Sequence, residues 1–149
     1  MTTKEKGQSD GLLVRDIALS ALLQILEEGQ FCHLVLRQAL EKYGWLQVRD
    51  RSFLTRLVQG TVERMPELDS SLNQYSKVPV KKMKPVIRTI LRMTAYQIYY
   101  MDSVPDSAAC NEAVKLAGKR GFASLKGFVN GVSRSVARGK ADRVLPISW

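Results

Sequence analysis

Hydrophobic residues recur along this chain at the three- and four-residue spacing that places side chains on one face of an α-helix. The first such stretch begins near Asp10, a good N-cap residue, and ends at Gly29. Its apolar positions are Val14, Ala18, Ala21, Leu22 and Ile25. No alternating pattern continues for more than a few positions, so the sequence predicts an all-α protein.

Six further helices are predicted, and glycine or proline separates most of them. They run from about residue 33 to 43, from 50 to the break at Pro66, over 68 to 75, from 85 to 102, from 105 to 121 and from 123 to 137. The helix that starts at Pro85 is apolar over so wide a surface that it is expected to be central and largely buried.

The segment before that central helix, residues 77 to 84, is basic and contains Pro79. It is predicted to be a hinge between two helical subdomains. A chain of 149 residues has the size of one domain, which is expected to span residues 10 to 140. A flexible start is expected at 1 to 9, and the beginning of a truncated linker at 141 to 149.

Charge is distributed unevenly. Residues 1 to 76 contain 9 Lys and Arg against 10 Asp and Glu, a net of −1, whereas residues 77 to 149 contain 14 against 4, a net of +10. Clustered cations gain affinity for phosphates by releasing counterions, so a polyanion partner is expected. A solvated basic surface is the alternative.

Polar and basic side chains occupy every fourth position of the last predicted helix and therefore share one face, opposite the apolar stripe. These residues are Lys126, Asn130, Arg134 and Arg138. The preceding helix adds the cations Lys115, Lys119 and Arg120. The two helices are expected to form one basic surface, although the spacing alone fits a solvated helix face equally well.

In the central helix, Arg88 and Arg92 stand on nearly the same side as Tyr96 and Tyr99. Arginine beside tyrosine can stack on unpaired RNA bases. Partly buried structural tyrosines are the preferred interpretation here.

No enzyme signature is found. The sequence has no GxGxxG or GxxxxGK[ST] motif, and the single histidine, His33, has no recognisable nucleophile arranged around it. Cys32 and Cys110 are too few for a structural zinc site and are interpreted as small apolar residues in a reducing compartment. No cofactor, no metal and no membrane partner are expected, and neither a membrane span nor a secretory signal is found, so a cytoplasmic location is expected.

Four stretches together resemble the NusB family, over roughly residues 12 to 138. They are Arg15 with Ala18 and Leu22; Asp50-Arg51-Ser52-Phe53 with Leu57-Val58 and Gly60-Thr61; Leu91-Arg92, Tyr96-Gln97, Pro105 and Asn111-Glu112-Ala113-Val114 with Ala117; and Gly127-Phe128-Val129-Asn130-Gly131-Val132 with Arg134. Gln97 and Arg134 make the chain more similar to the NusB-like N-terminal domain of ribosomal RNA cytosine-5 methyltransferases of the RsmB type.

This resemblance implies an all-α fold of about seven helices in two packed helical subdomains. It also implies RNA contacts at Arg15 and around Lys126, Phe128 and Asn130. For Phe128, which lies on the apolar stripe, a core role is preferred. In the methyltransferase type, the S-adenosylmethionine-dependent chemistry would belong to a C-terminal domain that this chain lacks.

Three functions follow as hypotheses. The first is a non-catalytic RNA-binding domain that recognises ribosomal RNA for a cytosine-5 methyltransferase. The second is a transcription antitermination factor that binds RNA together with a ribosomal protein. The third is a helical protein-docking module whose basic face binds an acidic surface.

Overall fold

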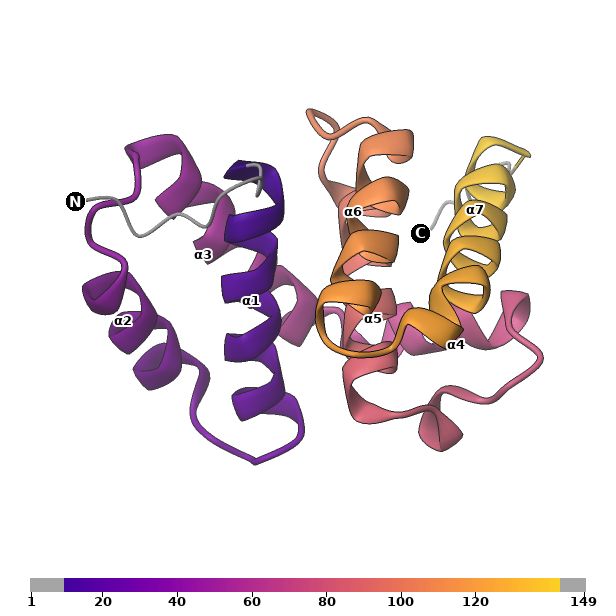
Figure 1. Ribbon diagram of the computed structural model, residues 1–149, viewed down its shortest axis with the longest axis horizontal. Helices are drawn as coiled ribbons and strands as arrows, with labels where there is room; N and C mark the ends of the chain where they lie inside the picture. The colour runs from indigo at the N-terminus through magenta and orange to yellow at the C-terminus, as the bar shows by residue number, and fades with distance from the viewer. Residues whose placement is uncertain (1–9, 143–149) are drawn as a thin grey trace, which may run out of the picture.

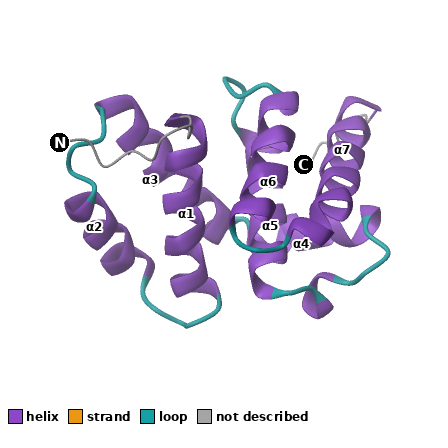
Figure 2. Ribbon diagram, in the orientation of Figure 1, coloured by secondary structure: helices purple, strands orange, loops and turns teal. Residues whose placement is uncertain are grey.

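The computed structural model describes residues 10–142 and contains seven α-helices and two short 3-10 helices in that range. The elements are α1 (Asp10–Leu26), α2 (Cys32–Lys42), α3 (Val48–Glu63), α4 (Met65–Tyr75), η1 (Val80–Lys82), α5 (Pro85–Tyr100), α6 (Asp106–Lys119), η2 (Ala123–Leu125) and α7 (Lys126–Asp142). The predictions of an all-α fold and of seven helices are confirmed (Figure 2).

The helices form two bundles that lie side by side (Figure 1). In the first, α1 packs against both α2 and α3; in the second, α5 packs against α4, α6 and α7. Contacts of α5 with α1 and α3, and of α6 with α1, join the two bundles. The predicted pair of packed helical subdomains is therefore confirmed.

Helix α5 is the centre of the molecule, as its wide apolar surface predicted. All ten residues from Thr89 to Ile98 are buried. Its packing against α3 is close enough that a Cβ atom added to Gly60 would overlap the ring of Tyr96. Only glycine, which has no Cβ atom, allows α3 and α5 to pack this closely at position 60.

The predicted hinge at residues 77–84 is wrong. The chain passes from the first bundle to the second between α3 and α4, at Arg64, and residues 77–84 connect α4 and α5 within the second bundle. Val80 and Met83 are buried in the core, so the segment is fixed to the bundle that it belongs to. A basic, proline-containing composition is common to hinges and to anchored loops, and it does not distinguish them.

The last helix also differs from its prediction. Residues 123–125 form a separate 3-10 turn, in which the Leu125 N–H donates to the Phe122 carbonyl, and α7 then continues to Asp142. Such tight turns are common at helix starts. The predicted flexible start, residues 1–9, lies outside the described residues, as do residues 143–149 of the predicted linker.

Candidate nucleic-acid interface

Carboxylates of the first bundle and of α4 neutralise both arginines of α5. Arg88 donates from Nε and Nη2 to the two carboxylate oxygens of Glu27, at 2.8 and 2.5 Å, and Arg92 donates in the same two-pronged way to Asp69, at 2.7 and 3.0 Å. The Arg88 hydrogen bonds hold the pKa of Glu27 below its ordinary value. These arginines act as structural crosslinks, and they are not available to a ligand.

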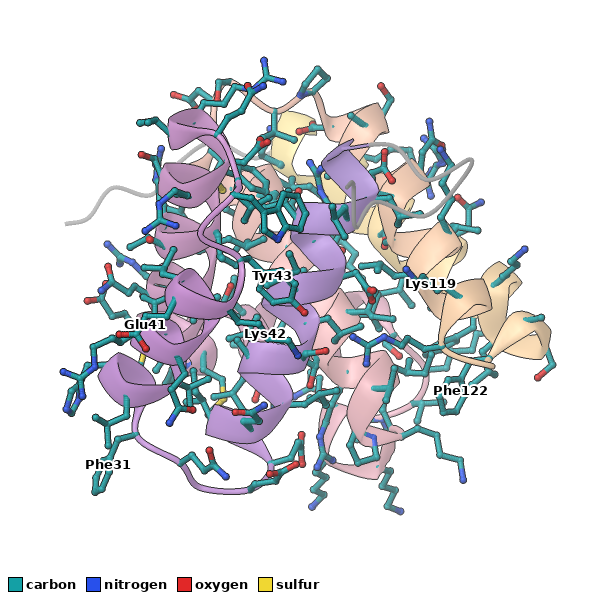
Figure 3. The ribbon with its side chains drawn as sticks, turned by 60° about the vertical axis from the view of Figure 1, so that its left-hand side comes forward. Phe31, Glu41, Lys42, Tyr43, Lys119 and Phe122 are labelled. Atoms are coloured by element: carbon teal, nitrogen blue, oxygen red, sulfur yellow. The ribbon has the colours of Figure 1, made fainter. Side chains whose placement is uncertain are left out.

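A similar pairing occurs at the C-terminal end of α6. Arg120 donates from Nε to Asp16 Oδ1 at 2.9 Å and from Nη2 to the hydroxyl of Ser20 at 2.7 Å, while Lys119 Nζ lies 3.0 Å from Asp16 Oδ2. Figure 3 shows Lys119 at this end of α6, on the side of α1. Two of the predicted RNA-binding cations therefore have an internal acidic partner.

The remaining predicted residues of α6 and α7 gather on one face. Arg134 donates from Nε to Asn130 Oδ1 at 3.0 Å, which confirms that residues four apart on α7 share a side, and from Nη2 to Asn111 Oδ1 of α6 at 2.8 Å. The helices α6 and α7 thus present a common polar surface. We call Asn111, Lys115, Lys126, Asn130, Arg134 and Arg138 the α6–α7 face.

At the start of α7, the aliphatic part of Lys126 lies on Gly118 of α6. A Cβ atom added to Gly118 would lie 2.5 Å from Lys126 Cε. Lys126 and Lys115 are exposed and form no ion pair with the residues that the structure describes. Arg138 is exposed and donates to the hydroxyl of Ser135, one turn earlier on α7, at 3.2 Å. Among the side chains that the structure describes, no carboxylate therefore pairs with the cations of this face.

Arg15 lies apart from this face and is buried, with 7% of its surface exposed. It donates from Nε to Gln97 Oε1 at 2.8 Å and from Nη1 to the Gly11 carbonyl at 3.1 Å, and its guanidinium stacks 4.9 Å from the centre of the Phe53 ring. Burial lowers the pKa of Arg15 from its ordinary value, and nearby Glu112 opposes that shift. In this position Arg15 connects α1 to α3 and α5.

The comparison with known sequences decides the family. Residues 13–138 match the sequence profile of the NusB family. The chain belongs to the NusB family.

Relatives of two kinds are found. A probable ribosomal RNA small subunit methyltransferase B from Bacillus subtilis (strain 168) is 39% identical over 125 residues, which are 84% of this chain and 28% of that protein. A transcription antitermination protein NusB from Symbiobacterium thermophilum is 38% identical over 133 residues, covering 84% of this chain and 87% of that protein. The chain thus spans under a third of the methyltransferase that it resembles.

The fold of this NusB-family chain also matches solved structures. A chain in the crystal structure of the antitermination factors NusB and NusE in complex with double-stranded RNA superposes with a TM-score of 0.78, over 87% of this chain and 96% of that one, at 19% identity. The two-bundle architecture is therefore that of the family.

Other residues singled out from the sequence have structural roles in this NusB-family fold. Tyr96 is buried, and the hydroxyl of Tyr99 is hydrogen-bonded to Ser71 at 2.6 Å, which confirms the structural interpretation of the two tyrosines. Phe128 is half-buried and packs against the core. Cys110 is buried in the core, as predicted, and burial raises the pKa of its thiol.

Within residues 10–142, no group of three or more His, Cys, Asp or Glu is arranged to hold a metal ion. No helix in the same range is both long and apolar enough to cross a membrane.

Proposed function

We propose that this chain is a non-catalytic RNA-binding module of the NusB type that holds ribosomal RNA for a cytosine-5 methyltransferase. The observation that carries the proposal is the α6–α7 face, where basic side chains that form no ion pair with any described residue gather on two packed helices. The similarity to a probable ribosomal RNA methyltransferase supports this choice of RNA. A cytoplasmic location is part of the proposal.

Binding would depend on phosphate neutralisation. Lys126 and Arg138 are exposed cations about three turns apart on α7, and Lys115 is an exposed cation on the adjoining α6. A row of cations of this length suits contacts to a sugar-phosphate backbone that carry no base information. Asn130 and Asn111 each direct the side-chain oxygen at Arg134, so their amide nitrogens remain to donate to phosphate or to 2′-hydroxyl oxygens. This geometry favours recognition of RNA by shape.

Three further residues predicted to contact RNA, Arg15, Lys119 and Arg120, would contribute less directly because each already has a partner within the protein. Lys119 and Arg120 border the α6–α7 face and would reach phosphates in competition with Asp16. Arg15 would contribute through the position of α1, because its guanidinium is engaged by Gln97 and Phe53.

A second candidate function is that of a transcription antitermination factor that binds RNA together with a ribosomal protein. It is favoured by the antitermination relative, of which the chain covers 87%. Co-purification of this chain with the NusE protein of the same organism would support this second candidate. Both candidates use the same RNA surface and differ in the protein partner.

The test is a fluorescence-anisotropy titration of labelled small-subunit ribosomal RNA fragments with the wild type and with the double variant Lys126→Glu/Arg134→Glu. The matched control is Arg37→Glu/Lys42→Glu, which reverses two exposed charges on α2. We expect steeply salt-dependent binding that the α7 variant loses and the α2 variant retains. Weak, salt-insensitive binding by all three would contradict the proposal and favour a docking module for an acidic protein.

A further inference from the structure

A second group of cations without acidic partners lies on the loop between α4 and α5. Four of the eight residues from 77 to 84 are lysines, and all four are exposed. They are Lys77, Lys81, Lys82 and Lys84, which we call the lysine loop. None of them forms an ion pair with any residue in the part of the chain that the structure describes.

Three acidic residues that lie around α5 are engaged by other side chains. Glu27 is held by Arg88, Asp69 by Arg92, and Glu67 by Arg64 and the Tyr100 hydroxyl. Part of the +10 charge of the second half is therefore cancelled by carboxylates of the first half, on α5 and at the end of α6. Lys140 pairs with Asp106 of its own half. Among the second-half cations that the structure describes, those without an acidic partner are concentrated in two places, the α6–α7 face and the lysine loop.

The loop is held in a defined shape. Val80 and Met83 are buried, the Val80 N–H donates to Asn73 Oδ1 at 2.9 Å, and η1 forms one turn between them. Arg88 donates to the carbonyls of Lys81 and Met83, at 3.2 and 3.3 Å, while it also binds Glu27 of the other bundle. Four like charges are thus fixed near one another, although their repulsion favours separation.

We propose that the lysine loop is a second phosphate-binding site, which contacts the backbone of the same RNA that the α6–α7 face binds. This inference rests on the proposed function. Lysine is a point charge with rotatable donors, so a fixed backbone that carries four of them suits evenly spaced phosphates without sequence preference.

The surroundings of the loop favour RNA over an acidic protein partner. Val78, at 39% exposed, is the one large hydrophobic side chain that this loop exposes, whereas protein interfaces have an apolar centre. In both Figure 1 and Figure 3 the α4–α5 connection lies at the lower end of the molecule, below the turn that joins α6 to α7. In Figure 3, long side chains that end in nitrogen extend from this lower end, away from the ribbon.

The experiment compares the salt dependence of RNA binding by the full chain and three variants. Lys81→Gln/Lys82→Gln removes two charges from the loop, Lys81→Arg/Lys82→Arg retains them, and Arg37→Gln/Lys42→Gln removes two exposed charges from α2 as the matched control. The probe is the labelled ribosomal RNA fragment. In a second measurement, lysines are acylated with and without RNA, and mass spectrometry shows which of them RNA protects. The exposed Lys42 of α2 is the internal reference.

We expect the glutamine loop variant to lower the slope of log affinity against log salt by about 1.5, because two phosphate contacts are lost. The arginine variant and the α2 control should retain the wild-type slope, and RNA should protect the loop lysines from acylation. A wild-type slope in the glutamine variant, together with unprotected loop lysines, would overturn this inference and leave the α6–α7 proposal standing. If the wild type itself does not bind RNA, the proposed function fails, and the inference fails with it.

Discussion

Asp16 and Arg120 are 104 residues apart in the sequence and form a hydrogen-bonded ion pair of 2.9 Å between the two bundles. The second oxygen of the same carboxylate lies 3.0 Å from Lys119 Nζ. One acidic side chain therefore neutralises two cations at the edge of the α6–α7 face. It stabilises the contact between α1 and α6 and at the same time reduces the positive potential available to RNA.

Asp16→Asn is expected to increase RNA affinity and to make its salt dependence steeper, because the change removes a negative charge that lies beside Arg120 and Lys119. The same change should lower the free energy of unfolding by about 1 kcal/mol. Anisotropy titrations and urea denaturation measure the two effects. Glu41→Gln is the control, since it removes one exposed negative charge from α2. Equal affinities for the two variants would show that the end of α6 takes no part in binding.

Arg15→Met is expected to reduce stability more than RNA affinity. It leaves Gln97 Oε1 buried without its donor, which costs about 1–3 kcal/mol. The exposed Arg138→Met should show the reverse, a stability within about 0.5 kcal/mol of the wild type and a weaker complex. Urea midpoints and RNA titrations of the two variants separate the roles. A fully stable Arg15→Met protein that has lost RNA binding would identify Arg15 as a direct contact.

Acid should weaken the Glu27–Arg88 crosslink. The pKa of Glu27 is lowered in the folded protein, so its contribution to stability is present above its ordinary value of 4.5 and is lost as the pH falls through the folded pKa. Glu27→Gln should therefore be less stable at neutral pH and lose less stability on acidification. Urea denaturation between about pH 6 and about pH 3 measures this. Its exposed neighbour Glu28, changed to Gln, should follow the wild-type curve.

Replacing each of two helical glycines by alanine should change the stability of the protein in opposite directions. Gly131 of α7 has open space where a Cβ would lie, so Gly131→Ala should stabilise the protein by about 0.5–1 kcal/mol through helix propensity. Gly60→Ala would drive its Cβ into the ring of Tyr96 and should destabilise it by about 1–3 kcal/mol. Thermal or urea denaturation checks both variants. A stabilising Gly60→Ala would mean that α3 and α5 separate easily.

Much of the fold was predictable because it depends on local patterns. The apolar spacing located seven helices, and the width of the apolar surface identified α5 as the buried one. The four-residue spacing of Asn130 and Arg134 placed them on one face of α7, which their hydrogen bond confirms. These features require only the geometry of a helix and the separation of polar from apolar residues.

The pairing of charges was not predictable in the same way. Glu27 and Arg88 are 61 residues apart, and no local pattern connects them or links Asp16 to Arg120. As a result, no sequence pattern distinguishes the paired cations of the second half from the unpaired ones. The fold divides them into those that join helices and those that remain for a ligand. The anchored lysine loop was mistaken for a hinge for a related reason, because the burial of Val80 and Met83 arises only from tertiary packing.

The most direct test of the central claim is the mapping of RNA contacts by amide chemical shifts of this 16.7 kDa chain, recorded with increasing amounts of the ribosomal RNA fragment. We predict the largest shifts on the α6–α7 face, around Lys115, Lys126 and Arg134, with smaller shifts in the lysine loop. Shifts confined to α2 and α3, or no shifts at an RNA concentration that saturates binding, would contradict the account.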